Sequence, residues 1–163
     1  MTNDNIEIVD YKEEWSDFFT FSNLAWIKKY FIVEPEDEEI LFNPRKYILE
    51  NEGFIFFARI NNETAGTFAL IRAPEYKNEL VYELSKMAVS ENFQGQHVGH
   101  TMIEFCLKKA KELHADKVIL HTNKKLEAAI HLYKKFGFKE VPLSNAIYKR
   151  SNIKMEIDIN KNS

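Results

Sequence analysis

The alternation of apolar and polar residues along the chain predicts its strands. Ile153, Met155 and Ile157 alternate with Lys154 and other polar residues, which is typical of a strand with one buried face. Two β-prone runs at 54–60 and 64–71 flank an Asn-Asn turn pair, and together they predict a hairpin. The predicted strands cover residues 6–9, 54–60, 64–71, 80–89, 118–122 and 153–159.

The helical period of apolar residues predicts the helices. Val98, Met102 and Cys106 fall on one face of the segment that runs to residue 114. Pro44 marks another helix start, because its missing N–H costs nothing in a first turn. Gly137 follows a helical stripe at the point where a positive φ is wanted. The predicted helices cover residues 15–30, 43–50, 98–114 and 125–136, and residues 34–37 are predicted to form a turn.

The order of these elements predicts a mixed α/β domain with helices flanking a central sheet. The chain has 163 residues, a length that fits one compact domain with a full core of its own. We therefore expect residues 1–163 to form a single domain.

The charge balance and the cysteine count narrow the function classes. Lys and Arg number 22 against 25 Asp and Glu, so the chain lacks the basic excess of a general nucleic-acid binder. Its one cysteine, Cys106, can build neither a disulfide framework nor a cysteine metal site. The first residues lack the pattern of a signal peptide, and no apolar run approaches the roughly 20 residues of a membrane span. We expect a cytoplasmic protein that binds neither nucleic acid nor membranes, and homodimer formation stays open.

The most informative segment links a predicted strand to a predicted helix through residues 89–100. Helix N-termini bind anions through unpaired N–H groups, and Gly95 and Gly99 allow the backbone to approach a ligand closely. The segment lacks the Gly-Lys-Ser/Thr of a P-loop, and it lacks the three spaced glycines of a dinucleotide-binding fingerprint. Taken alone, two glycines near a helix start also fit packing or capping.

The surrounding pattern resembles the GNAT acetyltransferases. Their signature, Gln/Arg-x-x-Gly-x-Gly/Ala, follows a strand and opens a helix, and here the sequence reads Gln94-Gly95-Gln96-His97-Val98-Gly99. His97 stands where the family usually has its first glycine. A second stretch is also similar to the family, because Asn123 precedes a helix that carries Tyr133 and closes on Gly137-Phe138.

This resemblance implies both the architecture and the ligand. It implies a mixed, largely antiparallel sheet in which a splayed strand pair holds CoA. It also implies that a primary amine of a small molecule or peptide attacks acetyl-CoA directly in a ternary complex, without an acyl-enzyme. We expect no metal. The strand before the loop would bind the pantetheine arm and the thioester oxygen, the loop would bind the pyrophosphate, and Asn123 would bind the arm. The implied cofactor-binding residues are Met87, Ala88, Val89, Gln94, Gly95, Gln96, His97, Val98, Gly99, His100, Asn123 and Tyr133.

Two residues are candidates for proton transfer. Tyr133 matches the position of the family's general acid, although its place in an apolar helical stripe also fits a core aromatic. Glu83 is the candidate general base, because it precedes Met87 by four residues and so shares its strand face, subject to a bulge. An exposed strand residue is the alternative for Glu83. His97, His100 and His121 do not form a recognised metal spacing.

The predicted activity is therefore acetyl-CoA-dependent N-acetyl transfer. The alternative is a non-catalytic acyl-CoA-binding or sensory domain on the same fold, and the presence of both Glu83 and Tyr133 favours the enzyme. The resemblance implies an acceptor site between the early helices and the last hairpin, without specifying the amine. The aromatic and cationic residues contributed there are Trp26, Tyr30, Phe31, Tyr148 and Arg150, and the rings equally fit the core.

Overall fold

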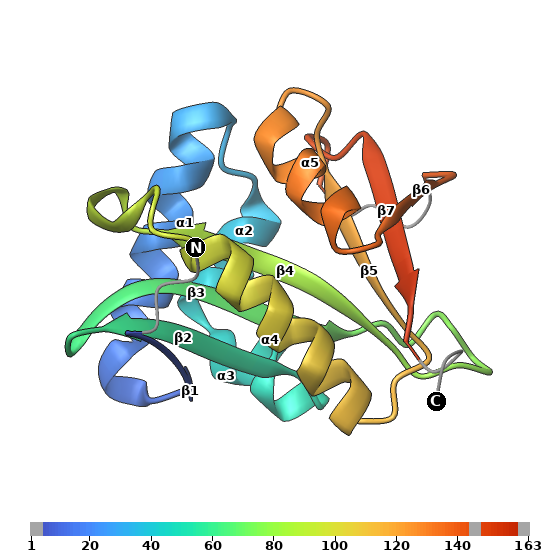
Figure 1. Cartoon of the computed structure of the whole chain (residues 1–163), viewed down its shortest axis with the longest axis horizontal. Coiled ribbons are helices and arrows are strands. Elements are labelled where there is room, and N and C mark those ends of the chain that lie inside the picture. The colour runs from blue at the N-terminus through green and yellow to red at the C-terminus, as the bar shows by residue number, and fades with distance from the viewer. Residues whose placement is uncertain (1–4, 144–147, 160–163) are drawn as a thin grey trace.

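A computed structural model describes residues 5–143 and 148–159 (Figure 1). Its centre is a seven-stranded sheet in the order β1-β2-β3-β4-β5-β7-β6. All neighbouring strands are antiparallel except β4 and β5, which are parallel. The predicted fold class, a mixed and largely antiparallel sheet flanked by helices, is confirmed.

The strands of the sheet are β1 (Ile6–Asp10), β2 (Phe54–Ile60), β3 (Glu63–Arg72), β4 (Val81–Val89), β5 (Lys117–Thr122), β6 (Lys139–Val141) and β7 (Ile153–Asp158). Six of them form where alternation and β-propensity predict a strand, and β6 is not among the predicted ranges. Lys154 of β7 departs from the expected polar face. Its side chain is buried and its ammonium donates a hydrogen bond to the hydroxyl of Tyr76.

The helices confirm three predicted segments and correct two expectations. The α-helices are α1 (Ser16–Tyr30), α2 (Pro35–Phe42), α3 (Pro44–Tyr47), α4 (Val98–Glu112) and α5 (Glu127–Lys135). Residues 34–37 were predicted to be a turn but begin α2, because Glu34 and Asp37 cap the helix reciprocally and Pro35 occupies its first turn. The helix predicted at 43–50 is broken into α3 and a 3-10 turn at Leu49–Asn51.

Helices cover both faces of the sheet (Figure 1). Helices α1 and α2 bury Phe19, Ile27 and Leu41 against one face. On the other face α4 buries Met102 and Ile103, and α5 packs beside it. In the part of the chain that the structure describes, no helix is long and apolar enough to cross a membrane.

Strand β4 is irregular at the position that creates the ligand-sized space. Between the pairs Ala69–Ser85 and Thr67–Ala88, β4 has one more residue than β3, so β4 is bulged. Lys86 lies in this bulge with a φ of 53°. On the other side, β4 pairs with β5 only from Val81 to Glu83. The two strands then diverge from their shared end (Figure 1).

Candidate active site

A pocket of about 780 Å³ lies where β4 and β5 diverge, and α1, α4 and α5 complete its walls. The structure brings together nearly all of the residues predicted for the site. Glu83, Met87, Ala88, Val89, Gln94, Gly95, His97, Val98, Gly99, His100, Asn123 and Tyr133 line the pocket. Gln96 is the one residue of the predicted site that does not line the pocket.

The loop before α4 has the geometry of a cradle for an anion. His97 caps α4 with a left-handed backbone at φ 63°, a conformation that glycine adopts more readily than other residues. Gly95 also has a positive φ, and a Cβ added there would meet no atom within 4 Å. A Cβ at Gly99 would meet only Leu132, at 3.8 Å, so the room above Gly99 belongs to the pocket. The backbone N–H groups that open α4 are therefore accessible to a phosphate, and the residues present fit the pyrophosphate of CoA.

Glu83 is the last residue of β4 that pairs with β5, at the point where these two strands begin to separate. Its carboxylate oxygen Oε2 is 3.2 Å from the imidazole Nδ1 of His121 on β5. Both residues line the pocket. The sequence did not reveal this contact, because the partners are 38 residues apart and only the parallel pairing of β4 with β5 brings them together.

Tyr133 lies on α5 with its ring half-buried against Phe138, at a centroid distance of 5.9 Å. Burial raises the pKa of Tyr133 to about 12, so its hydroxyl keeps its proton at neutral pH. Cys106 is fully buried, and burial raises the pKa of its thiol to about 12. A thiol that remains protonated and inaccessible is a poor nucleophile, which is consistent with direct attack by an amine.

Asn123 follows β5, and both ends of its amide have protein partners. Its Nδ2 donates to the carbonyl of Arg150 at 2.7 Å, and its Oδ1 accepts from the N–H of Lys125 at 2.9 Å. These bonds fit the alternative role of a turn residue before a helix. Contact between Asn123 and a pantetheine arm stays a prediction.

The aromatic residues expected near the acceptor also line the pocket. Trp26 lies 5.8 Å from Tyr30 and 5.9 Å from Phe31, ring centroid to ring centroid. Lys125 reaches across from the loop after β5 and donates to the carbonyl of Tyr30 at 2.6 Å. Tyr148 also lies in the pocket wall.

A buried ionic cluster completes this end of the site, and the sequence indicated only part of it. Asp37, Lys86 and Arg150 form its centre, of which only Arg150 was a candidate. Neither Asp37 nor Lys86 belongs to a local motif. Among the described residues, no group of three or more His, Cys, Asp or Glu side chains is placed to hold a metal ion.

Comparison with known proteins agrees with this geometry. The model of the acetyltransferase (GNAT) family matches residues 10–138. An uncharacterized N-acetyltransferase from Dictyostelium discoideum is 37% identical over 60 residues, a match that spans 37% of this chain and 28% of that protein. An acetyltransferase of the GNAT family from Staphylococcus aureus has a similar fold, with a TM-score of 0.81, 23% identity and coverage of 94% of this chain and 99% of that one.

A spermidine N-acetyltransferase from Vibrio cholerae, solved in complex with CoA and spermine, is also similar in fold. Its TM-score is 0.75 at 22% identity, and the match covers 98% of each chain. The family match covers most of the sequence, and the fold likeness extends over nearly the whole chain. The chain therefore belongs to the GNAT acetyltransferase family of N-acyltransferases.

Proposed function

We propose that the protein is an acetyl-CoA-dependent N-acetyltransferase that acts on a primary amine by direct attack in a ternary complex. The observation that carries this proposal is the pocket between β4 and β5. In one cavity it joins the N-terminus of α4, a strand edge released from pairing with β5, a carboxylate and a protonated phenol. Acetyl-CoA would supply the activated acetyl group as a thioester.

The strand and the loop would hold this ligand. Beyond Glu83, β4 has no ladder pair with β5 among the described residues, so the backbone groups of Met87, Ala88 and Val89 on that side can bind the pantetheine arm. A backbone N–H aimed at the thioester oxygen would also stabilise the negative charge that develops there. The N–H groups at the start of α4 would bind the pyrophosphate.

Glu83 and Tyr133 would carry the protons. The Glu83 carboxylate accepts the proton that the amine loses as the N–C bond forms, directly or through a water. The Tyr133 hydroxyl donates a proton to the sulfur as the C–S bond breaks. His121 holds the Glu83 carboxylate by its contact at 3.2 Å, which makes it a positioning residue.

The competing function is a non-catalytic acyl-CoA-binding domain, and thiol release distinguishes the two. The protein would be mixed with acetyl-CoA and a panel of primary amines and amino acids, and free CoA thiol would be followed over time. We expect thiol release that depends on both enzyme and acceptor, together with acetylated product by mass spectrometry. Tight CoA binding without acceptor-dependent release across the panel would favour the sensory domain.

A further inference from the structure

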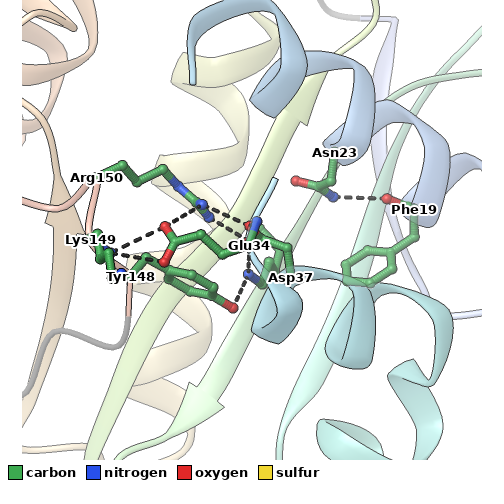
Figure 2. Close-up of polar contacts among 8 residues, drawn as sticks. Phe19, Asn23, Glu34, Asp37, Tyr148, Lys149 and Arg150 are labelled. Carbon is green, nitrogen blue, oxygen red and sulfur yellow. Dashed lines mark hydrogen bonds and ion pairs between the residues drawn. The ribbon is translucent and has the colours of Figure 1, made fainter. Parts of the chain in front are cut away.

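Asp37 is the centre of an ionic cluster at the acceptor end of the pocket. It is 0% exposed, and its two carboxylate oxygens accept hydrogen bonds from the two terminal nitrogens of Arg150 at 2.8 and 2.6 Å. It also accepts the backbone N–H of Glu34 at 2.8 Å and lies 3.6 Å from the ammonium of Lys86. Figure 2 shows Arg150 reaching from the C-terminal segment to Glu34 and Asp37. The hydrogen bonds and the ion pairs hold the pKa of Asp37 below its usual value despite burial, so Asp37 is charged.

Tyr148 joins the two cations of this cluster. Its hydroxyl accepts a hydrogen bond from the Lys86 ammonium at 2.6 Å. Its ring centroid is 4.1 Å from Lys86 Nζ and 4.2 Å from the guanidinium carbon of Arg150. Burial is the largest cause that raises the pKa of Tyr148, so the phenol is neutral and has its own proton to donate.

The cluster presents its positive side to the pocket. Lys86, Tyr148 and Arg150 line the cavity, whereas Glu34 and Asp37 do not. The four charged groups sum to zero, but the carboxylates lie behind the cations as seen from the pocket. Of the acids that line the cavity, Glu83 is the candidate base and Glu127 begins α5. The acceptor end therefore offers one carboxylate to an amine and a cationic wall to a second group.

We infer that the acceptor is a small amine that also carries a carboxylate, with its amine toward Glu83 and its carboxylate toward Arg150, Tyr148 and Lys86. This inference rests on the proposed function and names its substrate class. Charge-assisted hydrogen bonds to a carboxylate are among the stronger polar contacts in proteins. A polyamine would bring several ammonium groups against the same cations, and like charges across an interface are unfavourable.

The rest of the wall suits an acceptor with an apolar side chain. Trp26, Tyr30 and Phe31 line the pocket from the end of α1. Asn23 is 2% exposed, and its Nδ2 donates to the carbonyl of Phe19 at 2.9 Å. Figure 2 shows the amide oxygen of Asn23 on the side of the ionic cluster, so it can accept a hydrogen bond from an ammonium group. Aromatic amino acids are therefore suitable probes.

The experiment compares matched pairs of ligands for the protein saturated with CoA. Calorimetry would measure the binding of phenylalanine, phenylalaninamide and phenethylamine, of tryptophan and tryptamine, and of spermidine. We expect each amino acid to bind about 10- to 100-fold more tightly than its partner without the carboxylate, which is the range for a hydrogen bond to a charged group. Equal or tighter binding of the amines or of spermidine overturns the inference, and so does a lack of binding by the whole panel.

Substitution of Lys86 by methionine tests whether the ionic cluster causes the preference for amino acids over amines. In Lys86→Met, Asp37 keeps both Arg150 bonds and the Glu34 N–H, so no buried carboxylate is left unpaired. We expect the ratio of the affinity for the amino acid to the affinity for its amine partner to fall at least about threefold. Lys117→Met is the matched control, because Lys117 is a half-buried lysine outside the pocket that pairs with Glu156.

A second variant tests the inference independently, and CoA binding distinguishes its failure from failure of the proposed function. Tyr148→Phe removes the hydroxyl and should lower the same ratio without changing the charge, which provides a second test if Lys86→Met fails to fold. If Lys86→Met and Tyr148→Phe both fold and both keep the wild-type ratio of amino-acid affinity to amine affinity, the assignment to the cluster is contradicted. If the protein does not bind CoA at all, the proposed function fails instead.

Discussion

At the scale of single residues, the contact between Glu83 and His121 places a carboxylate where the two central strands separate. The side chain of Glu83 is 26% exposed, which leaves it accessible from the pocket, whereas the side chain of His121 is 7% exposed. A carboxylate held by an imidazole on the neighbouring strand has a fixed direction. This arrangement suits a proton acceptor better than an exposed strand residue with free rotamers.

Glu83→Gln should lower turnover by about 10²- to 10⁴-fold at neutral pH, the usual contribution of a general base. CoA affinity should change less than about threefold, because the amide keeps the size of the side chain. Turnover and CoA binding would be measured separately across pH. Glu7→Gln, at an exposed position of β1, is the control. A pH–rate profile identical to that of the wild type would assign Glu83 to structure alone.

Tyr133→Phe should reduce turnover by about 10- to 1,000-fold while CoA affinity and folding remain nearly intact. Phenylalanine keeps the ring that packs against Phe138, so the change removes only the hydroxyl. Tyr82→Phe, in the core and outside the pocket, controls for loss of a buried hydroxyl. If both variants retain wild-type turnover, Tyr133 is a core residue and the enzyme has another acid.

At the scale of elements, the residue that caps the N-terminus of α4 is strained. His97 has a left-handed backbone, which costs a non-glycine residue about 1–2 kcal/mol. His97→Gly should therefore raise the free energy of unfolding by roughly 0.5–1 kcal/mol, after the entropy of glycine in the unfolded chain is subtracted. CoA affinity should be unchanged or higher, as judged by denaturation and calorimetry. A loss of CoA affinity above about tenfold would show that the imidazole itself binds the ligand.

Helix α2 is fastened to the C-terminal segment through Asp37. Asp37→Ala would leave Arg150 and Lys86 without their buried carboxylate and remove half of the reciprocal cap. We expect a loss of about 3–5 kcal/mol in the free energy of unfolding. Glu38→Ala, one residue along the same helix and exposed, should cost less than about 1 kcal/mol. Similar losses in the two variants would contradict a structural role for the cluster.

The sequence predicted those elements whose periodicity is strong. Helix α4 and strand β7 have clear apolar faces, so their positions were predicted closely. Helix α2 was missed because Glu34-Pro35-Glu36-Asp37 has the composition of a turn, and the same acids serve as helix caps. The loop residues were found through a family pattern. The sequence did not predict the pairing of Asp37 with Arg150, because a contact between residues 113 positions apart leaves no local signal.

At the scale of the whole molecule, the sheet is split into two parts that share a short ladder. Strands β1 to β4 form one part and β5 to β7 the other, and the ladder between them ends at Glu83 and Ile119. Lys125 and Arg150 bridge the two parts near the acceptor end, at the carbonyl of Tyr30 and at Asp37. A ligand that fills the split would add contacts to both parts, so binding should stabilise the entire fold.

Calorimetric titration of CoA into the wild type and into Gly99→Val tests this account most directly. A Cβ at Gly99 meets only Leu132, at 3.8 Å, so Gly99→Val should fold, while its side chain fills the space above the loop. Glu104→Val, at an exposed position of α4 outside the pocket, controls for a β-branched residue introduced into the helix. We predict saturable binding to the wild type and to Glu104→Val. At a hundredfold excess over the dissociation constant, this binding should add about 2.7 kcal/mol of stability. The affinity of Gly99→Val for CoA should be at least about tenfold weaker than that of the wild type.

Two results would contradict the assignment of this pocket to CoA. One is that the wild type shows neither heat of binding nor a thermal shift with CoA, and the other is that a folded Gly99→Val binds CoA with the affinity of the wild type.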